Sequence, residues 1–288
     1  MSDQSLSLNA PIGVFDSGLG GLTVVRQIRE ALPHESILYI ADQAHVPYGG
    51  RPLEEVQGFA INISEYLIAS GCKAVVMACN ISSAVSLKIV QRDHPEIPVL
   101  GVILPGAAAA AESTKNGRIG VLATQGTVQS GAYTNAFADI DAKIRVFEVA
   151  CPLFVPLVES DRCDTLQALE AAETYLKPLI IAGVDTVVLG CTHYPFLLSS
   201  LRKISAELNY IDPSVATVKQ LARIVTDENL FAPRGSRSRC VLTTTGDVSL
   251  FEQQICRFLP ASVRISEVIK TDLQSSISPI LYSPVSAL

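Results

Sequence analysis

The feature of this sequence that most restricts its fold is a series of short apolar runs rich in Val and Ile. The runs are continuous rather than alternating, as is typical of strands covered on both faces of a parallel sheet. They begin at Ile12 (IGVFD), Ile37 (ILYIAD), Ala74 (AVVMAC), Ile97 (IPVLGVI), Arg118 (RIGVLAT), Lys143 (KIRVFEVA), Thr186 (TVVLGC) and Arg239 (RCVLTTTG). Stretches with helical spacing separate them, and those at 53–71 and 164–183 end in Gly, which is common at helix C-termini. Strands alternating with helices predict an α/β protein with parallel sheets.

Two pairs of segments resemble each other and occur in the same order. AVVMACN at 74–80 resembles TVVLGCT at 186–192, and IGV occurs at Ile12 and again at Ile119. The first IGV precedes its cysteine by 67 residues and the second by 72. We interpret the pattern as two similar α/β domains related by pseudo-twofold symmetry, with a cleft between them. Chance similarity between buried strands is the alternative.

The strand pattern also predicts domain boundaries. We place residues 10–103 and 213–270 in a first α/β domain and residues 104–212 in a second one, because GVILPGAAAAA passes from a strand into a new helix near Leu104. The Ser- and Pro-rich tail, residues 271–288, is predicted to be loosely packed.

Composition narrows the class of protein. Of the 288 residues, 48% are hydrophobic and 17% charged, which favours a well-buried globular core over disorder. The net charge of −6 disfavours contact with a phosphate backbone, so we do not expect direct nucleic-acid binding. Seven cysteines, an odd number without a C-x-x-C pair, indicate free thiols in a reducing compartment. We find no signal-peptide pattern and no run of about 18 uncharged apolar residues, so we expect a soluble cytoplasmic protein without a membrane span.

Two cysteines stand where an α/β protein binds its ligands. Cys79 and Cys191 follow predicted strands, as do Asp16 and Thr124, and ligands bind beyond the carboxyl ends of such strands. Facing domains would place one thiol on each side of a bound small molecule. A thiolate can remove a proton from one face of a carbon while the opposite thiol returns one to the other face. The repeated cysteine therefore predicts two-base racemisation, a reaction that requires neither a metal nor another cofactor.

Each of these assignments has an alternative. A buried cysteine is usually a small apolar side chain, and we interpret the other five in that way: Cys72, Cys151, Cys163, Cys240 and Cys256. FDSGLGG resembles a dinucleotide-binding turn, but the G-x-G-x-x-G pattern requires Gly where Thr23 stands, and Asp16 would repel a pyrophosphate. We interpret Asp16 and Ser17 as holding a polar substrate, with the carboxylate on an ammonium group.

His193 and a Gly-rich loop are further candidates. His193 could ligate a metal together with Cys191, but two ligands do not make a site. We expect it to protonate or orient the neighbouring thiol, and a purely structural histidine is the alternative. The segment ADQAHVPYGGRP at 41–52 is a predicted loop whose N–H groups could bind an anion, and an ordinary surface turn is the alternative.

Several segments together resemble a known family. They occur in order between residues 10 and 266, and they are PIGVFDSGLGGLTV, ADQAHVPYGGRP, VVMACNISSA, RIGVLATQGTV, CPLFVPLVE, VVLGCTHYPFL and TTTGDVSLF. The chain resembles the glutamate racemases of the cofactor-independent aspartate/glutamate racemase superfamily. The resemblance implies two α/β domains with the active site between them, and interconversion of L- and D-glutamate that supplies D-glutamate for peptidoglycan. It also implies that the protein uses no cofactor and forms a homodimer.

The resemblance assigns roles to individual residues. Cys79 and Cys191 take the places of the two proton-transferring thiols. The acid–base positions around them are Asp16, Asp42, Glu159 and His193. The substrate-contacting positions are Asp16, Ser17, Tyr48, Gly49, Asn80, Ile81, Thr124, Thr127, Thr192 and His193. Ile81 departs from the family pattern, which usually has Thr after Cys-Asn, so a hydroxyl contact is lost while the backbone N–H remains.

Two other functions stay open at this point. Aspartate racemisation differs from glutamate racemisation only in the side-chain pocket, and the VPYGG loop favours glutamate through the resemblance alone. A protein that mainly binds a partner, as some family members are reported to bind DNA gyrase, is the third hypothesis. The two intact thiols argue against an idle site.

Overall fold

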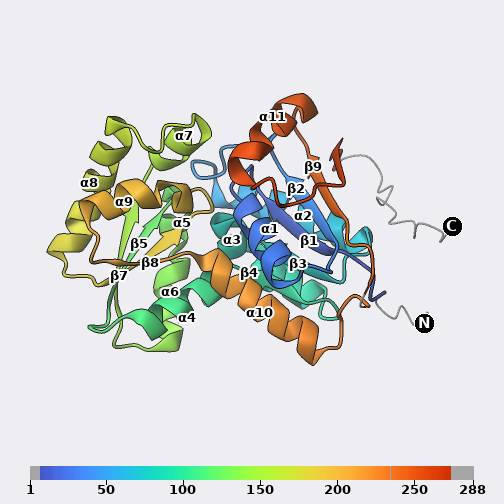
Figure 1. Ribbon diagram of the computed structural model, residues 1–288. Coiled ribbons are helices and arrows are strands. Elements are labelled where there is room, and N and C mark those ends of the chain that lie inside the picture. The colour runs from blue at the N-terminus through green and yellow to red at the C-terminus, as the bar shows by residue number, and fades with distance from the viewer. Residues whose placement is uncertain (1–6, 234, 274–288) are drawn as a thin grey trace.

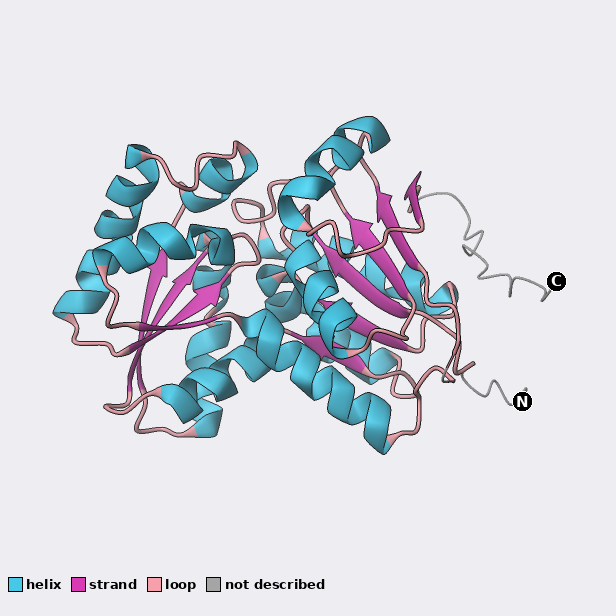
Figure 2. Ribbon diagram, viewed as in Figure 1, coloured by secondary structure: helices cyan, strands magenta, loops and turns pink. Residues whose placement is uncertain are grey.

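Two parallel β-sheets form the centre of the protein, and helices cover both faces of each sheet (Figure 1, Figure 2). The computed structural model describes residues 7–233 and 235–273. The first sheet has the strand order β10-β9-β2-β1-β3-β4 and the second has β6-β5-β7-β8, with all neighbouring strands parallel. The strands are β1 (Ile12–Asp16), β2 (Ile37–Ala41), β3 (Ala74–Met77), β4 (Val99–Gly101), β5 (Arg118–Ala123), β6 (Arg145–Ala150), β7 (Thr186–Gly190), β8 (Asn209–Ile211), β9 (Cys240–Thr244) and β10 (Glu267–Lys270). The predicted α/β fold class is confirmed.

Helices connect these strands, as parallel pairing requires. They are α1 (Leu22–Ala31), α2 (Leu53–Ala69), α3 (Asn80–Asp93), α4 (Ile103–Ser113), α5 (Gln125–Ser130), α6 (Ala132–Ile140), α7 (Phe154–Glu159), α8 (Leu166–Ile181), the 3₁₀ turn η1 (Tyr194–Leu197), α9 (Leu198–Ile204), α10 (Pro213–Asp227) and α11 (Val248–Phe258). The glycines predicted to end α2 and α8 are Gly71 and Gly183. Both have a left-handed backbone conformation, with φ of +80° and +69°. Glycine adopts this conformation without the steric cost that a Cβ atom brings.

The sequence repeat corresponds to a structural repeat. Four strands of the first sheet, in the order β2-β1-β3-β4, recur in the second sheet as β6-β5-β7-β8. Strand β1 is therefore equivalent to β5, and β3 is equivalent to β7. Cys79 and Cys191 leave these equivalent strands β3 and β7, which explains why similar segments with a cysteine occur twice in the chain.

Strands β8 and β10 were not predicted. Each is short and, among the residues that the structure describes, lies at the edge of its sheet, with β8 next to β7 and β10 next to β9. Their sequences, NYI and EVIK, include exposed polar residues, because an edge strand faces solvent on one side. The continuous apolar pattern that reveals a central strand is therefore absent from both.

The chain passes between the two sheets twice. It leaves the first sheet after β4 and returns after β8 through α10, which packs against both α1 and α4. The Asp212 carboxylate caps α10 by accepting the N–H of Ser214 at 2.9 Å. The exact boundaries 103/104 and 212/213 stay a prediction. Residues 274–288, most of the tail predicted to be loosely packed, lie outside the described residues.

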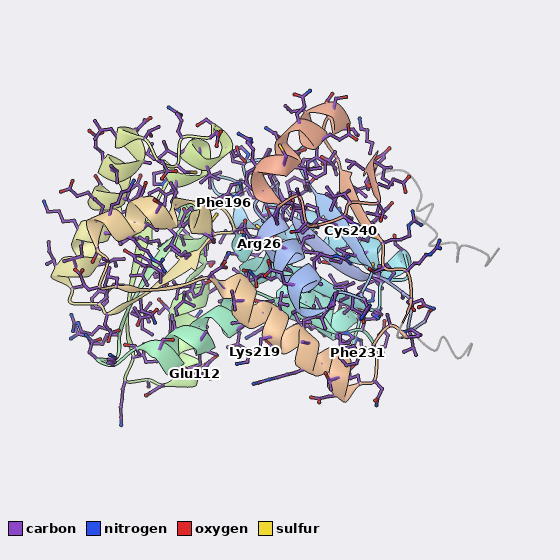
Figure 3. The ribbon with its side chains drawn as sticks, in the orientation of Figure 1. Arg26, Glu112, Phe196, Lys219, Phe231 and Cys240 are labelled. Carbon is purple, nitrogen blue, oxygen red and sulfur yellow. The ribbon has the colours of Figure 1, made fainter. Side chains whose placement is uncertain are left out.

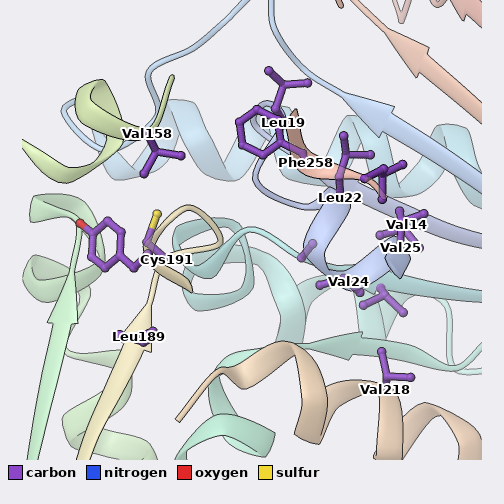
Figure 4. Close-up of a cluster of buried hydrophobic side chains, with 14 of the residues drawn as sticks. Val14, Leu19, Leu22, Val24, Val25, Val158, Leu189, Cys191, Val218 and Phe258 are labelled. Atoms are coloured by element: carbon purple, nitrogen blue, oxygen red, sulfur yellow. The ribbon is translucent and has the colours of Figure 1, made fainter. Parts of the chain in front are cut away.

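An apolar cluster continues from one domain into the other. Figure 4 shows Leu22 and Phe258 on the side of the first sheet, and Val158 and Leu189 on the side of the second. Cys191 belongs to the same cluster and is 7% exposed. Complete burial of one such apolar side chain contributes roughly 1.5–3 kcal/mol. The cluster therefore holds the domains together next to one of the two thiols.

A buried ion pair lies at the opposite end of the first sheet. The Lys73 ammonium lies 2.5 Å from the Glu35 carboxylate, and the two side chains are 0% and 2% exposed. The ammonium also donates to the carbonyls of Leu8 at 2.8 Å and Leu230 at 2.7 Å. Burial lowers the pKa of Lys73, and the hydrogen bond and charge of Glu35 oppose that shift. This pair ties the segment before β1 and the segment after α10 to the start of β3.

Candidate active site

Residues that follow β1, β3, β5 and β7 line a single cavity of about 740 Å³. It receives side chains from both domains, as predicted for a cleft between them. The predicted site residues that line it are Ser17, Tyr48, Gly49, Cys79, Asn80, Ile81, Thr124, Thr127, Glu159, Cys191, Thr192 and His193. Asp16 and Asp42 do not line it, and each instead supports a residue that does.

Cys79 lies between β3 and α3. Its backbone is extended, with φ of −70° and ψ of 125°, and α3 begins at the next residue. The free N–H groups of the first helical turn therefore lie beside the thiol. Burial, and after it the charge of Asp16, raise the pKa of Cys79 to about 12, against hydrogen bonds from Ser82 that lower it. At neutral pH, Cys79 carries its proton.

Cys191 has different neighbours. Its sulfur lies 3.8 Å from Nδ1 of His193. Nε2 of His193 lies 3.4 Å from Oε1 of Glu159, which is an ion-pair distance without hydrogen-bond alignment. The three side chains form a row that runs from the thiol to a partly exposed carboxylate.

Opposing effects act on His193. Burial lowers its pKa, but the contacts with Cys191 and Glu159, and the charges of Cys191 and Asp16, raise it more, to about 10. His193 is therefore positively charged at neutral pH. An imidazolium beside a cysteine favours the thiolate. The cavity thus has a protonated thiol on one side and, on the other, a thiol next to a cation.

Asp16 joins the two domains from behind the cavity wall. It is 1% exposed, and its oxygens accept the N–H of Gly18 at 3.1 Å and the Thr192 hydroxyl at 3.3 Å. Burial raises the pKa of Asp16, while the charge of His193 and these hydrogen bonds lower it. The predicted contact with an ammonium group stays a prediction.

The glycines of FDSGLGG permit a close approach of the two domains. A Cβ atom on Gly20 would overlap the Thr192 hydroxyl, and it would lie 2.6 Å from Nδ1 of His193. A Cβ on Gly21 would lie 2.5 Å from Cβ of Asp16. The turn that resembles a dinucleotide motif thus serves to bring the first domain against the residues after Cys191.

The loop after β2 is organised by Asp42. Its buried carboxylate accepts hydrogen bonds from the Tyr48 hydroxyl at 2.5 Å, from Nδ1 of His45 at 2.9 Å and from the Thr245 hydroxyl at 2.8 Å. The His45 ring stacks on Phe59, with 4.1 Å between centroids. Because these bonds occupy its carboxylate, Asp42 positions Tyr48 at the cavity rather than facing it.

Helix α5 closes another side of the cavity. The Thr124 hydroxyl caps it, lying 3.4 Å from the N–H of Thr127 and 3.0 Å from the Thr127 hydroxyl. The N–H of Gly126 donates to the carbonyl of Gly49 in the other domain at 3.0 Å. A Cβ on Gly126 would overlap Cδ1 of Ile81. Ile81 therefore packs across the domain boundary as well as lining the cavity.

Helix α11 holds the residues around Cys191 from the first domain. The Phe258 ring meets the His193 ring edge-on at 6.2 Å and the Phe196 ring at 4.9 Å between centroids, and Figure 3 shows Phe196 between the two halves of the molecule. A guanidinium N–H of Arg257 donates to the carbonyl of Glu159 at 3.0 Å. His193 and its partner Glu159 are thus both contacted by α11 across the cleft.

Sequence reasoning missed several residues of the cavity wall. They are Val46, Pro47, Gly50, Gln125, Cys151, Pro152, Val155, Pro156, Ser160, Arg162, Gly190 and Gln254. Some lie in segments that carried the family resemblance, such as CPLFVPLVE. Arg162 and Gln254 lie outside those segments, and no sequence pattern distinguishes them from ordinary surface residues.

Among residues 7–233 and 235–273, no group of three or more His, Cys, Asp or Glu side chains is arranged to hold a metal ion. None of the helices that the structure describes combines the length and the apolar character needed to cross a bilayer.

The fold and the cavity define a two-domain α/β protein with a thiol from each domain at one site. Residues 12–221 match the family described as Asp/Glu/Hydantoin racemase. A glutamate racemase from Pediococcus pentosaceus is 41% identical over 261 residues, which cover 90% of this chain and 98% of the relative.

Solved structures agree with the sequence match. A glutamate racemase isoform from Bacillus anthracis is 40% identical, with a TM-score of 0.86 over 92% of this chain and 98% of that one. The glutamate racemase from Francisella tularensis, solved in complex with D-glutamate, is 32% identical, with a TM-score of 0.87 over 93% of this chain and 100% of that one. The chain belongs to the Asp/Glu/hydantoin racemase family, which confirms the predicted family and enzyme class, an amino-acid racemase.

Proposed function

We propose that the protein interconverts L-glutamate and D-glutamate, with Cys79 and Cys191 as acid and base and without a cofactor. The observation that carries the proposal is the placement of these two cysteines, at equivalent strand ends of two similar domains, on one cavity. The relatives that match this chain over most of its length are named glutamate racemases, which supports glutamate as the substrate.

The reaction balances with two sulfurs and one carbon. A thiolate on one side takes the α-proton, and the electron pair of the broken C–H bond remains on Cα, delocalised into the α-carboxylate. The thiol on the opposite side then gives its proton to the other face of Cα and becomes a thiolate. One S–H bond has formed, another has broken, and the carbon is inverted.

The surroundings of the two thiols support these roles. The pKa of Cys79, raised to about 12 first by burial, suits a proton donor. His193, charged below pH 10 and 3.8 Å from Cys191, stabilises a thiolate there. Glu159 orients His193 from the far side. A proton donor on one side of the cavity and a cation that favours a thiolate on the other are what a two-base reaction requires.

Polar groups of the cavity suit an amino acid with two carboxylates. The first turn of α3 offers Asn80 and the N–H of Ile81 to one carboxylate, because helix N-termini bind anions. Thr192, held by Asp16, adds a hydroxyl on the other side of the cleft. The Tyr48–Gly49 loop is placed to receive the second carboxylate. We assign substrate contacts to Ser17, Thr124, Thr127 and His193 as well, since they line the same cavity.

We expect Ile81 to affect the affinity for the substrate more than the rate of proton transfer. Its side chain is 2% exposed and packs on Gly126, so it offers no hydroxyl to the substrate. Its backbone N–H keeps the carboxylate contact. The proposal also includes a homodimer in the cytoplasm that supplies D-glutamate for peptidoglycan. Light scattering of the purified protein tests the dimer.

The test is proton NMR of L-glutamate in D₂O with purified protein and no added cofactor. We expect the α-proton signal to disappear while circular dichroism reports formation of the D-isomer. A parallel sample with L-aspartate separates the two substrates. Exchange on aspartate alone would assign the protein to aspartate, and exchange on neither would favour a binding protein.

Cysteine variants test the mechanism. Cys79→Ser and Cys191→Ser should each lower the racemisation rate by about 10²–10⁴-fold, because a serine hydroxyl is a far weaker acid than a thiol. Cys256→Ser is the matched control, since Cys256 is exposed and does not line the cavity. Full activity in either cavity variant would refute the two-thiol mechanism.

A further inference from the structure

Tyr133 of α6 reaches from the second domain to the first. Its hydroxyl donates to Oδ1 of Asn80 at 2.8 Å. Tyr133 is 0% exposed and Asn80 is 5% exposed, so water does not compete for this bond. Asn80 directly follows Cys79 and lines the cavity, whereas Tyr133 does not line it.

The same side chain also contacts the strand that carries the second thiol. A Cβ atom on Gly190, the residue before Cys191, would lie 3.1 Å from Cε2 of Tyr133. Tyr133 thus lies between the residue after Cys79 and the residue before Cys191. Its ring also packs on Phe137, with 6.4 Å between centroids, which fixes its orientation.

The hydrogen bond determines which way the Asn80 amide points. An amide has an acceptor oxygen and an NH₂ donor on opposite sides. Burial raises the pKa of Tyr133 well above its usual value, so its hydroxyl keeps the proton and remains a donor. With Oδ1 of Asn80 engaged by Tyr133, the NH₂ group is directed away from Tyr133.

We propose that Tyr133 is a positioning residue that acts through Asn80, holding the NH₂ group toward the cavity as a donor to the substrate's α-carboxylate. The proposal rests on the proposed function, because it names the group that this donor serves. The α-carboxylate is attached to the carbon that receives the proton of Cys79 in the proposed reaction, and Asn80 adjoins Cys79. Negative charge grows on it as the proton leaves, so the contact strengthens in the transition state.

A double-mutant cycle tests the coupling. Tyr133→Phe should lower kcat/KM for glutamate by about tenfold, which corresponds to one buried hydrogen bond. In an Asn80→Ala background the same change should cost less than about twofold, because the partner is already gone. An equal loss in both backgrounds would overturn the proposal. Tyr210→Phe is the matched control, since its hydroxyl bonds to the carbonyls of Leu201 and Ser205 and Tyr210 does not line the cavity.

Asn80→Asp tests the orientation without disturbing Tyr133. The new carboxylate still accepts from the Tyr133 hydroxyl, but it presents oxygen where the NH₂ group stood. We expect kcat/KM to fall by about 100-fold or more through repulsion of the substrate carboxylate, and the inhibition constant of glutarate to rise in parallel. Unchanged kinetics would mean that the amide oxygen faces the cavity, and the proposal would be wrong.

Failure of the proposed function gives a different result. If the wild type exchanged no α-proton, glutamate racemisation would be refuted, and the α-carboxylate assignment would fall with it. The coupling between Tyr133 and Asn80 would then be measured by thermal unfolding of the wild type, the two single variants and the double variant. The losses in melting temperature should be less than additive, and additive losses would show that the two side chains are uncoupled.

Discussion

Replacing Gly20 by Ala tests whether the close approach of the two domains sets the catalytic geometry. The added Cβ would overlap the Thr192 hydroxyl and would lie 2.6 Å from Nδ1 and 2.8 Å from Cε1 of His193. Neither neighbour is free to move away. Thr192 donates to Asp16 at 3.3 Å, and His193 is held by Cys191 at 3.8 Å. Relief of the overlap must therefore break one of these contacts or separate the domains.

The size of the effect follows from these constraints. Forcing an extra methyl group into a packed site costs about 1–3 kcal/mol of stability. Catalysis should suffer more than stability, because a displacement of about 1 Å between reacting groups can cost about 100-fold in rate. We expect Gly20→Ala to lower kcat/KM by about 100-fold in both directions, while the protein stays folded at 25 °C.

Two measurements and one control complete this test. Racemisation is followed by circular dichroism from each enantiomer, and stability by urea unfolding. Gly58→Ala is the control, since Gly58 lies inside α2 with no atom within 4 Å of an added Cβ. It should keep full activity and gain about 0.5–1 kcal/mol of stability. Activity of Gly20→Ala within twofold of the wild type would refute the reasoning.

Three further predictions concern other parts of the molecule. Lys73→Met should lower the free energy of unfolding by about 3–5 kcal/mol, because it leaves the buried Glu35 carboxylate without its cation. Urea unfolding measures this, and Lys88→Met on the exposed face of α3 should change little. Ile81→Thr should lower KM for glutamate by about three- to tenfold through one added hydroxyl contact, read from initial rates. His193, whose pKa is lowered by burial but raised more by Cys191 and Glu159 to about 10, loses its charge above that pH. The racemisation rate should therefore fall as pH rises through about 10, and a pH–rate profile of His193→Gln should lack this fall.

The central strands of the fold could be predicted because burial on both faces leaves a continuous apolar pattern. The repeat was visible because β1 and β5, and likewise β3 and β7, occupy equivalent positions and meet the same packing demands. Strands β8 and β10 escaped prediction because their short sequences, NYI and EVIK, include exposed polar residues and give no continuous apolar run. Lys73 also escaped it, since a buried cation is recognised only when its partner Glu35, distant in sequence, is placed beside it.

The site residues that could be predicted are those that directly follow a predicted strand. Cys79 and Cys191 follow strands, and that alone marks the ligand-binding edge of a parallel sheet. Contacts between the two domains leave no comparable pattern in the sequence. Tyr133, Phe258 and Arg257 lie on helices whose sequences are ordinary, and their roles depend on how the domains meet. The same holds for Gly20, whose small size matters only against the opposite domain.

Similar domains need not give their two cysteines similar neighbours. Here Cys79 faces the charge of Asp16, which raises its pKa after burial has done so, while Cys191 faces the His193 cation. In the proposed reaction Cys79 gives its proton to Cα while Cys191 takes the substrate's α-proton, and the row from Cys191 through His193 leads to the partly exposed Glu159. The fold thus supplies two equivalent positions, and the residues after each strand give the two cysteines different charged neighbours.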